Sequence, residues 1–124
     1  NMLPAAMECR ELLSRGKVSA RVVSFHTVKP LDERLLASAF RRFKLVATVE
    51  EHSVLGGLGG AVAEWVCDQG LASANLLRLG APDRFLHEAG GQEFARGRCG
   101  LTPAKLASRI LSRLKSSGRH LPGS

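Results

Sequence analysis

Hydrophobic residues recur at helical spacing in four segments of the chain. In the first, residues 4–15, the side chains of Cys9, Leu12 and Leu13 fall on one face of a helix. A proline near the start of this segment and Gly16 just after it are typical helix boundary signals. The pattern therefore predicts an amphipathic helix here, and the same spacing predicts three more, over residues 33–43, 59–69 and 103–117.

Three shorter runs are apolar or rich in β-branched residues and too short for helices. They cover residues 20–25, 45–49 and 75–79, and each lies between two predicted helices. Strands separated by helices pair in parallel through right-handed crossovers, which leaves helices on both faces of the sheet. The chain is therefore predicted to be an α/β domain.

The chain begins on a helix, without a preceding strand from which that helix could cross over. Three parallel strands would also make a narrow sheet, so we expect a further, first strand to be missing from the N-terminus. Residues 80–100 are rich in glycine with weak periodicity, which favours an irregular loop. We expect one domain over residues 1–118 and a flexible tail over residues 119–124.

Length and composition fit a single soluble domain. The 124 residues are 44% hydrophobic, which is enough for one core. Because the sequence contains neither a membrane-length apolar run nor a signal-peptide pattern, we expect a cytoplasmic protein that does not bind a membrane. The three cysteines are widely spaced and lack local histidine partners, so reduced thiols are expected and a metal site is not.

The formal charge of +7 raises the possibility of nucleic-acid binding. The basic residues are spread out, however, and none lies between Lys44 and Arg78, where four acidic residues occur. The chain has no tyrosine, five phenylalanines and one tryptophan, so it offers few rings on which bases could stack. We therefore expect no nucleic-acid partner.

Polar residues that could carry chemistry follow the first two predicted strands. His26 comes after one, and Glu50, Glu51 and His52 come after the next. In open α/β sheets ligands bind at the carboxyl ends of the strands, and a carboxylate beside an imidazole can act as an acid/base pair. One interpretation is a hydrolase or isomerase that uses His26 and Glu51. The alternative is that these polar residues cap the following helix or form a domain interface.

A glycine-rich segment containing Gly56, Gly57 and Gly59 precedes the third predicted helix. Bare amides at a helix N-terminus attract anions, so a stand-alone nucleotide or anion-binding module is an alternative function. The segment lacks the lysine of a P-loop and the glycine order of a dinucleotide site, and glycines also permit close packing.

Three motifs, taken in chain order, resemble one family. They are HTVKPLD at residues 26–32, VEEHSVLGGLG at residues 49–59 and LGAPDRF at residues 79–85. Together they resemble the C-terminal domain shared by transketolase, 1-deoxyxylulose-5-phosphate synthase and the β subunits of 2-oxoacid dehydrogenases. The resemblance covers residues 4–114 and leans toward transketolase, particularly the split, two-subunit kind.

The resemblance implies a three-layer sandwich around a mostly parallel, five-stranded sheet that usually includes one antiparallel strand. The family domain begins with a strand and a short turn before its first helix, which agrees with a missing first strand in this chain. It also leaves room for a further strand within residues 86–101.

For function, the resemblance implies a non-catalytic C-terminal domain or subunit of a thiamine-diphosphate-dependent transferase of carbohydrate metabolism. Thiamine diphosphate and Mg²⁺ would be held by the preceding domains, or by a catalytic subunit, with which this domain packs in a homodimer. The chain itself is then expected to hold no catalytic, cofactor-binding or metal-binding residue. The candidates for strand-end or interface roles are His26, Lys29, Asp32, Glu50, Glu51, His52, Gly56, Gly57 and Gly59.

Overall fold

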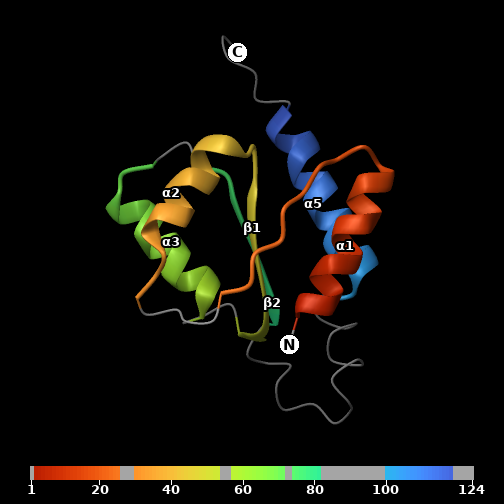
Figure 1. Ribbon diagram of the computed structural model, residues 1–124, viewed down its shortest axis with the longest axis horizontal. Coiled ribbons are helices and arrows are strands. Elements are labelled where there is room, and N and C mark those ends of the chain that lie inside the picture. Colours follow the sequence, from red (N-terminus) through yellow and green to blue (C-terminus); the bar gives the residue numbers. More distant parts are fainter. Residues whose placement is uncertain (1, 26–29, 54–56, 72–73, 82–99, 119–124) are drawn as a thin grey trace.

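The computed structural model describes residues 2–25, 30–53, 57–71, 74–81 and 100–118 (Figure 1). Two parallel strands lie in the middle, α1 and α5 lie on one side of them, and α2 and α3 lie on the other (Figure 1). This is the three-layer α/β arrangement. In chain order the elements are α1 (Leu3–Arg15), α2 (Glu33–Arg42), β1 (Val46–Ser53), α3 (Leu58–Asp68), β2 (Leu76–Ala81) and α5 (Pro103–Gly118).

The two strands pair in parallel, with α3 as the crossover between them. Val46 lies opposite Leu76 and Val49 lies opposite Leu79, and the register then shifts before Ser53 meets Ala81. The shift marks an irregularity near the carboxyl end of β1, close to the start of α3. Within the described residues, β1 and β2 make up a two-stranded sheet.

The core between the sheet and the α1/α5 layer holds the most deeply buried side chains. Leu79 of β2 and Leu106 of α5 are both 0% exposed, and Leu77 of β2 is 5% exposed. Cys9 and Leu13 of α1 belong to the same cluster. The apolar face that the spacing of α1 predicts is therefore the face that packs against the sheet.

A second core lies between the sheet and the α2/α3 layer, around Trp65. The Trp65 ring stacks on Phe40 with 6.1 Å between ring centroids. Its indole Nε1 donates a hydrogen bond of 2.9 Å to Oε1 of Glu33 at the start of α2. Leu36 and Val62 complete the buried part of this cluster. Trp65 thus connects α3 to α2 by both packing and a hydrogen bond.

The end of α1 agrees with the sequence prediction, because the helix ends at Arg15 and Gly16 is its C-cap residue. Gly16 has an ordinary φ of −85°, and Lys17 is the residue with a left-handed φ of 65°. The amides of Lys17 and Val18 donate to the carbonyls of Ser14 and Leu13, which is the hydrogen-bond pair of a Schellman motif. Lys17 therefore occupies the position that usually favours glycine.

Residues 20–25 do not form the predicted strand, so that prediction was wrong. They run beside the sheet without a ladder of their own. β-Branched composition favours strands only where a neighbouring strand supplies the hydrogen bonds, and here the space between this segment and β1 is a cavity. The predicted boundary of the next strand was also wrong, because β1 continues through Glu50, Glu51 and His52.

The four predicted helices and the other two predicted strands are confirmed, within a few residues at their ends. The further strand expected within residues 86–101 and the tail at residues 119–124 fall mainly or wholly outside the described residues. Among the helices that are described, none combines the length and apolarity that a membrane crossing requires.

Candidate functional site

The carboxylate of Glu50 lies at the N-terminus of α3. Its Oε1 accepts a 3.0 Å hydrogen bond from the Leu58 amide, and its Oε2 accepts a 2.7 Å bond from the Gly59 amide. These amides belong to the first turn of the helix, which has no carbonyl partners of its own, and a negative charge is favourable there. Glu50 thus fastens β1 to α3 and takes the role that an N-cap side chain would have, while Gly57 at the N-cap position has no side chain.

Glycines at positions 57 and 59 make room for this carboxylate. A Cβ on Gly57 would overlap Oε1 of Glu50. A Cβ on Gly59 would lie 2.9 Å from both Glu50 Oε2 and Thr48 Oγ1, and 3.1 Å from Arg78 Nε. Neither glycine has a left-handed φ, so the requirement is for space. The glycine-rich segment therefore allows close packing of α3 on the sheet.

Two buried polar groups beside Gly59 were not found by the sequence analysis. Thr48 of β1 is 6% exposed and lies opposite Arg78 of β2 in the parallel ladder. Both side chains point toward the first turn of α3, as their short approaches to the Gly59 position indicate. A threonine and an arginine within otherwise apolar strand runs were the available signal, since a charged residue in a buried strand needs polar surroundings.

The structure brings together Glu50, Gly57 and Gly59 from the predicted set. Asp32 lies elsewhere, as the N-cap of α2, where its Oδ1 accepts a 3.1 Å hydrogen bond from the Leu35 amide. Glu51 is half-buried in β1, and His52 continues the same strand. The remaining candidates, His26, Lys29 and Gly56, lie outside the described residues.

The arrangement is poorly suited to binding an anion at α3. A phosphate would need the amides that Glu50 already occupies, and it would meet the negative charge of that carboxylate. Acid/base chemistry by Glu50 is disfavoured for a similar reason, because both carboxylate oxygens accept from backbone amides. In the part of the chain that is described, no three His, Cys, Asp or Glu side chains gather as metal ligands would.

Neither Cys9 nor Cys67, the two cysteines within the described residues, supplies a nucleophile next to this site. Cys9 is buried in the α1/α5 core, and burial raises the pKa of its thiol above the ordinary value of 9.0. A raised pKa keeps the thiol protonated at neutral pH, so it is a poor nucleophile. Cys67 is exposed near the end of α3, away from the amides that Glu50 binds.

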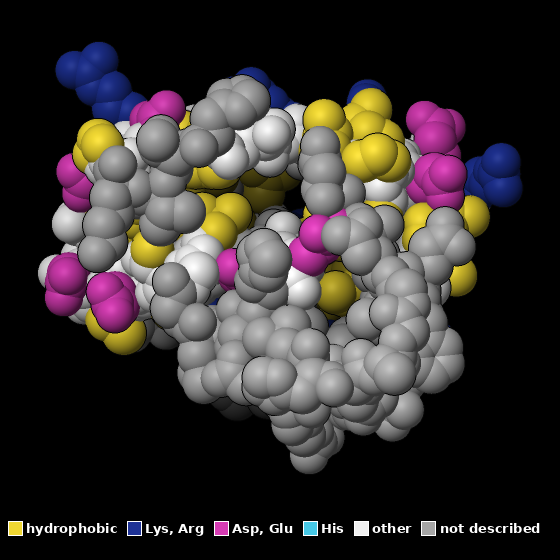
Figure 2. All heavy atoms as spheres, turned by 90° about the horizontal axis from the view of Figure 1, so that it is seen from below, with side chains coloured by type: hydrophobic (Ala, Val, Ile, Leu, Met, Phe, Trp, Pro, Cys, Tyr) yellow, Lys and Arg dark blue, Asp and Glu magenta, His cyan; other side chains and the backbone are white. Residues whose placement is uncertain are grey.

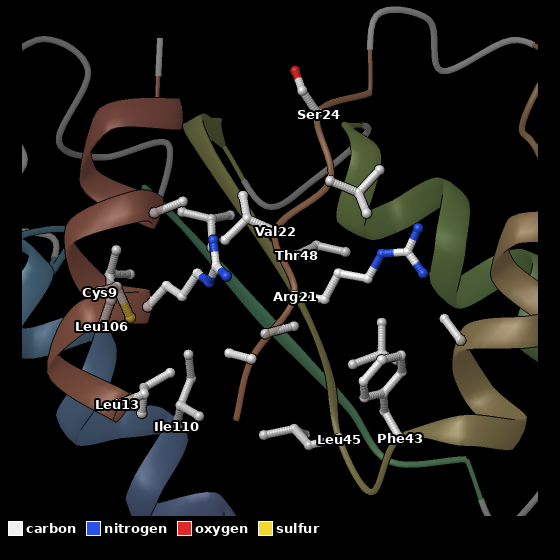
Figure 3. Close-up of a pocket in the computed structure, with 18 of the residues that line it drawn as sticks. Cys9, Leu13, Arg21, Val22, Ser24, Phe43, Leu45, Thr48, Leu106 and Ile110 are labelled. Atoms are coloured by element: carbon white, nitrogen blue, oxygen red, sulfur yellow. The ribbon is translucent and has the colours of Figure 1, made fainter. Parts of the chain in front are cut away.

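A hollow of about 710 Å³ lies between residues 18–25 and β1 (Figure 3). Cys9 and Leu13 of α1 and Ile110 of α5 stand on one side of it (Figure 3). Figure 2 looks onto the end of the molecule where the two strands end. In this view, hydrophobic side chains line a hollow between the two helical layers. Glu50 and Leu58, which form one of the hydrogen bonds between β1 and α3, also line this slot.

The fold and site define an α/β sandwich domain in which a strand carboxylate and two glycines join the sheet to a crossover helix. The chain belongs to the family described as "Transketolase, C-terminal domain", which it matches over residues 1–105. The resemblance seen in the three sequence motifs is therefore confirmed.

Individual relatives agree with this family. The chain is 36% identical over 124 residues to the 1-deoxy-D-xylulose-5-phosphate synthase of Synechococcus sp. (strain CC9605), covering 100% of this chain and 19% of the relative. It is 37% identical over 113 residues to a putative transketolase C-terminal section of Methanocaldococcus jannaschii, covering 91% of this chain and 34% of the relative.

A solved structure titled "Split gene transketolase, inactive beta4 tetramer" has the same fold, with a TM-score of 0.80 and 31% identity. The similarity covers 92% of this chain and 36% of that chain. The present chain therefore spans about a fifth of the synthase and about a third of the two transketolase chains.

Proposed function

We propose that this chain is a non-catalytic C-terminal domain of a thiamine-diphosphate-dependent, transketolase-like enzyme, and that it serves domain packing and dimer assembly. The observation that carries the proposal is that the Glu50 carboxylate accepts hydrogen bonds from two backbone amides of α3. The most enzyme-like carboxylate of the strand-end motif is held by two amides of α3, so the motif organises the domain itself. Family membership and the greater length of the relatives agree with a part of a larger enzyme.

In this proposal thiamine diphosphate and Mg²⁺ are held by other domains or by a separate catalytic subunit. The length of the relatives supports this, because the chain covers 19% of the synthase and 34% of the transketolase section. The amides at the start of α3 are also occupied, so they do not provide a diphosphate site. The partner is then the thiamine-binding part of the same enzyme, within a homodimer.

A chimera tests the proposal. The stretch of the Synechococcus synthase that matches this chain would be replaced by residues 1–124, and dimer formation, thiamine diphosphate binding and synthase activity would be measured. We expect the chimera to assemble and to retain activity, and we expect a synthase without the stretch to lose assembly. The isolated chain should give no heat of binding with thiamine diphosphate and Mg²⁺ in calorimetry.

A Glu50→Ala chimera and a matched Glu64→Ala chimera sharpen the test, because Glu64 lies on the exposed side of α3. Loss of assembly in the first and not in the second would support a structural role for the Glu50 contact. Stoichiometric cofactor binding by the isolated chain, or activity in a synthase that lacks the stretch, would contradict the proposal.

The same fold serves equally in a 1-deoxy-D-xylulose-5-phosphate synthase, to which this chain is 36% identical. This second candidate differs from the first only in the reaction of the whole enzyme. An assay of the full-length enzyme for formation of 1-deoxy-D-xylulose 5-phosphate, beside an assay for transketolase activity, separates the two.

A further inference from the structure

Thr48 is a buried polar side chain on the face of the sheet that α3 covers. It is 6% exposed, and its hydroxyl has no hydrogen-bond partner among the described residues. Its neighbours in β1, Ala47 and Val49, pack on the α1/α5 core, so Thr48 points to the opposite face, toward α3 (Figure 3). Native proteins usually satisfy such a buried hydroxyl with a protein group or with an ordered water.

Other polar groups surround the Thr48 hydroxyl at the first turn of α3. A Cβ on Gly59 would lie 2.9 Å from Oγ1 of Thr48 and 2.9 Å from Oε2 of Glu50. The same position is 3.1 Å from Nε of Arg78. Any two of these three atoms therefore lie within about 6 Å of each other, which is the span of two hydrogen bonds through one bridging oxygen.

The chemistry of the three groups favours water over an ion. A cation would meet the guanidinium of Arg78, and an anion would meet the carboxylate of Glu50. A water molecule is uncharged, so it can accept from the Arg78 Nε–H and donate to both the hydroxyl and the carboxylate. Oε2 of Glu50 has a second lone pair for this bond, beside the one that receives the Gly59 amide. Three hydrogen bonds are the usual number for a buried water.

We propose that one ordered water molecule binds beneath the first turn of α3, where it donates to Thr48 Oγ1 and Glu50 Oε2 and accepts from Arg78 Nε. It lies beside the Cβ position of Gly59, because that position itself is one bond length from the Gly59 Cα. The water satisfies the buried hydroxyl and connects β1, β2 and α3, so the Glu50 contact is one part of a larger polar cluster. This inference goes beyond the proposed function and does not depend on it.

The 124-residue chain itself gives the first test. Oxygen-17 magnetic relaxation dispersion counts long-lived waters without interference from exchangeable protein protons, and a high-resolution crystal structure locates them. We expect a water within hydrogen-bond distance of all three atoms. The proposal is overturned if the crystal structure shows Thr48 Oγ1 bonded directly to a protein group, or shows an ion in place of the water.

Two substitutions at position 48 separate the hydroxyl from the shape of the side chain. Thr48→Val keeps the shape and removes the hydroxyl, so the count of long-lived waters should fall by one. The Gly59 amide, which donates to Glu50, should then exchange with solvent about fivefold faster, the factor expected for loss of one ordinary hydrogen bond. Thr48→Ser keeps the hydroxyl and should keep both the water and the exchange rate of the parent chain.

Ser112→Ala is the control, because it removes an exposed hydroxyl from α5 and should leave the water count unchanged. An unchanged count in Thr48→Val, or equal losses in Thr48→Val and Ser112→Ala, would overturn the proposal. If Thr48→Val does not fold, the parent chain and Thr48→Ser still decide the point, because both must show the water in the crystal structure.

Discussion

Single side chains connect the strands to the helices in this domain, and Glu50 illustrates how. Its two carboxylate oxygens accept from the amides of Leu58 and Gly59, eight and nine residues further along the chain. A glutamine at this position has one oxygen in place of two and no charge. One amide of the first turn of α3 would then face an amide donor.

We therefore expect Glu50→Gln to lower the free energy of unfolding by about 1–3 kcal/mol, the cost of a partly buried charged hydrogen bond left unmade. Urea unfolding followed by circular dichroism measures this change. The matched control is Glu64→Gln on the exposed face of the same helix, which should stay within about 0.5 kcal/mol of the parent chain. Equal stability of the two variants would show that the contact does not stabilise the fold.

A second residue-level prediction concerns the space at Gly59. Gly59→Ala should lower the free energy of unfolding by about 1–3 kcal/mol, because its methyl group would press on Glu50, Thr48 and Arg78. Gly16→Ala provides the control. Its Cβ would meet two backbone carbonyl oxygens at ordinary contact distances of 3.5 and 4.0 Å, so this variant should be as stable as the parent or slightly more stable. Thermal unfolding of the two variants decides the point.

A third prediction follows from the left-handed φ of 65° at Lys17. Glycine adopts this conformation without the steric cost that a Cβ incurs, so Lys17→Gly should raise the free energy of unfolding by about 0.5–1 kcal/mol. Arg15→Gly removes the same charge inside α1 and should lower it by a similar amount. If Lys17→Gly destabilises the chain in urea unfolding, the Schellman assignment is wrong.

Among the elements, α2 and α3 are joined by the hydrogen bond from Trp65 to Glu33 and by the stacking of Trp65 on Phe40. A double-mutant cycle of Glu33→Ala and Trp65→Phe should give a coupling energy of about 0.5–1.5 kcal/mol, since each single change removes the same hydrogen bond. The cycle of Glu64→Ala with Trp65→Phe serves as the control and should show no coupling. Both are measured by urea unfolding.

The elements also show why some sequence predictions succeed. The helices were predicted correctly because helical spacing, caps such as Asp32 and Thr102, and glycine stops are local features. Residues 20–25 have the composition of a strand, but a strand also needs a partner with which to form hydrogen bonds. The left-handed backbone of Lys17 has no local signal in the sequence, and it is seen only in the structure, where the Val18 amide donates to the Leu13 carbonyl.

For the molecule as a whole, burial of Cys9 links stability to pH. The pKa of its thiol is raised by burial, so the folded state holds this proton more tightly than the unfolded state. The resulting stabilisation is present below the unfolded pKa and is lost as pH rises through the folded pKa. The free energy of unfolding should therefore fall above about pH 9.

Cys9→Ala should be less stable at neutral pH, because it leaves a small cavity, and its stability should decline less between about pH 8 and about pH 10. Cys67→Ala should keep the decline of the parent chain, since Cys67 is exposed. Urea unfolding at the two pH values measures both. An equal decline in all three proteins would show that Cys9 does not contribute to it.

The sequence by itself determined the helices, two of the strands, the α/β class and the family, because hydrophobic spacing, helix caps and motifs all depend on residues that are close together in the chain. Only the tertiary structure decided what the motif does. It brings Glu50 onto the amides of α3, and it places Arg78 of a different strand beside Gly59. It also opens a slot between β1 and a segment that has the composition of a strand. These features depend on contacts between residues distant in the chain, and no local pattern records such contacts.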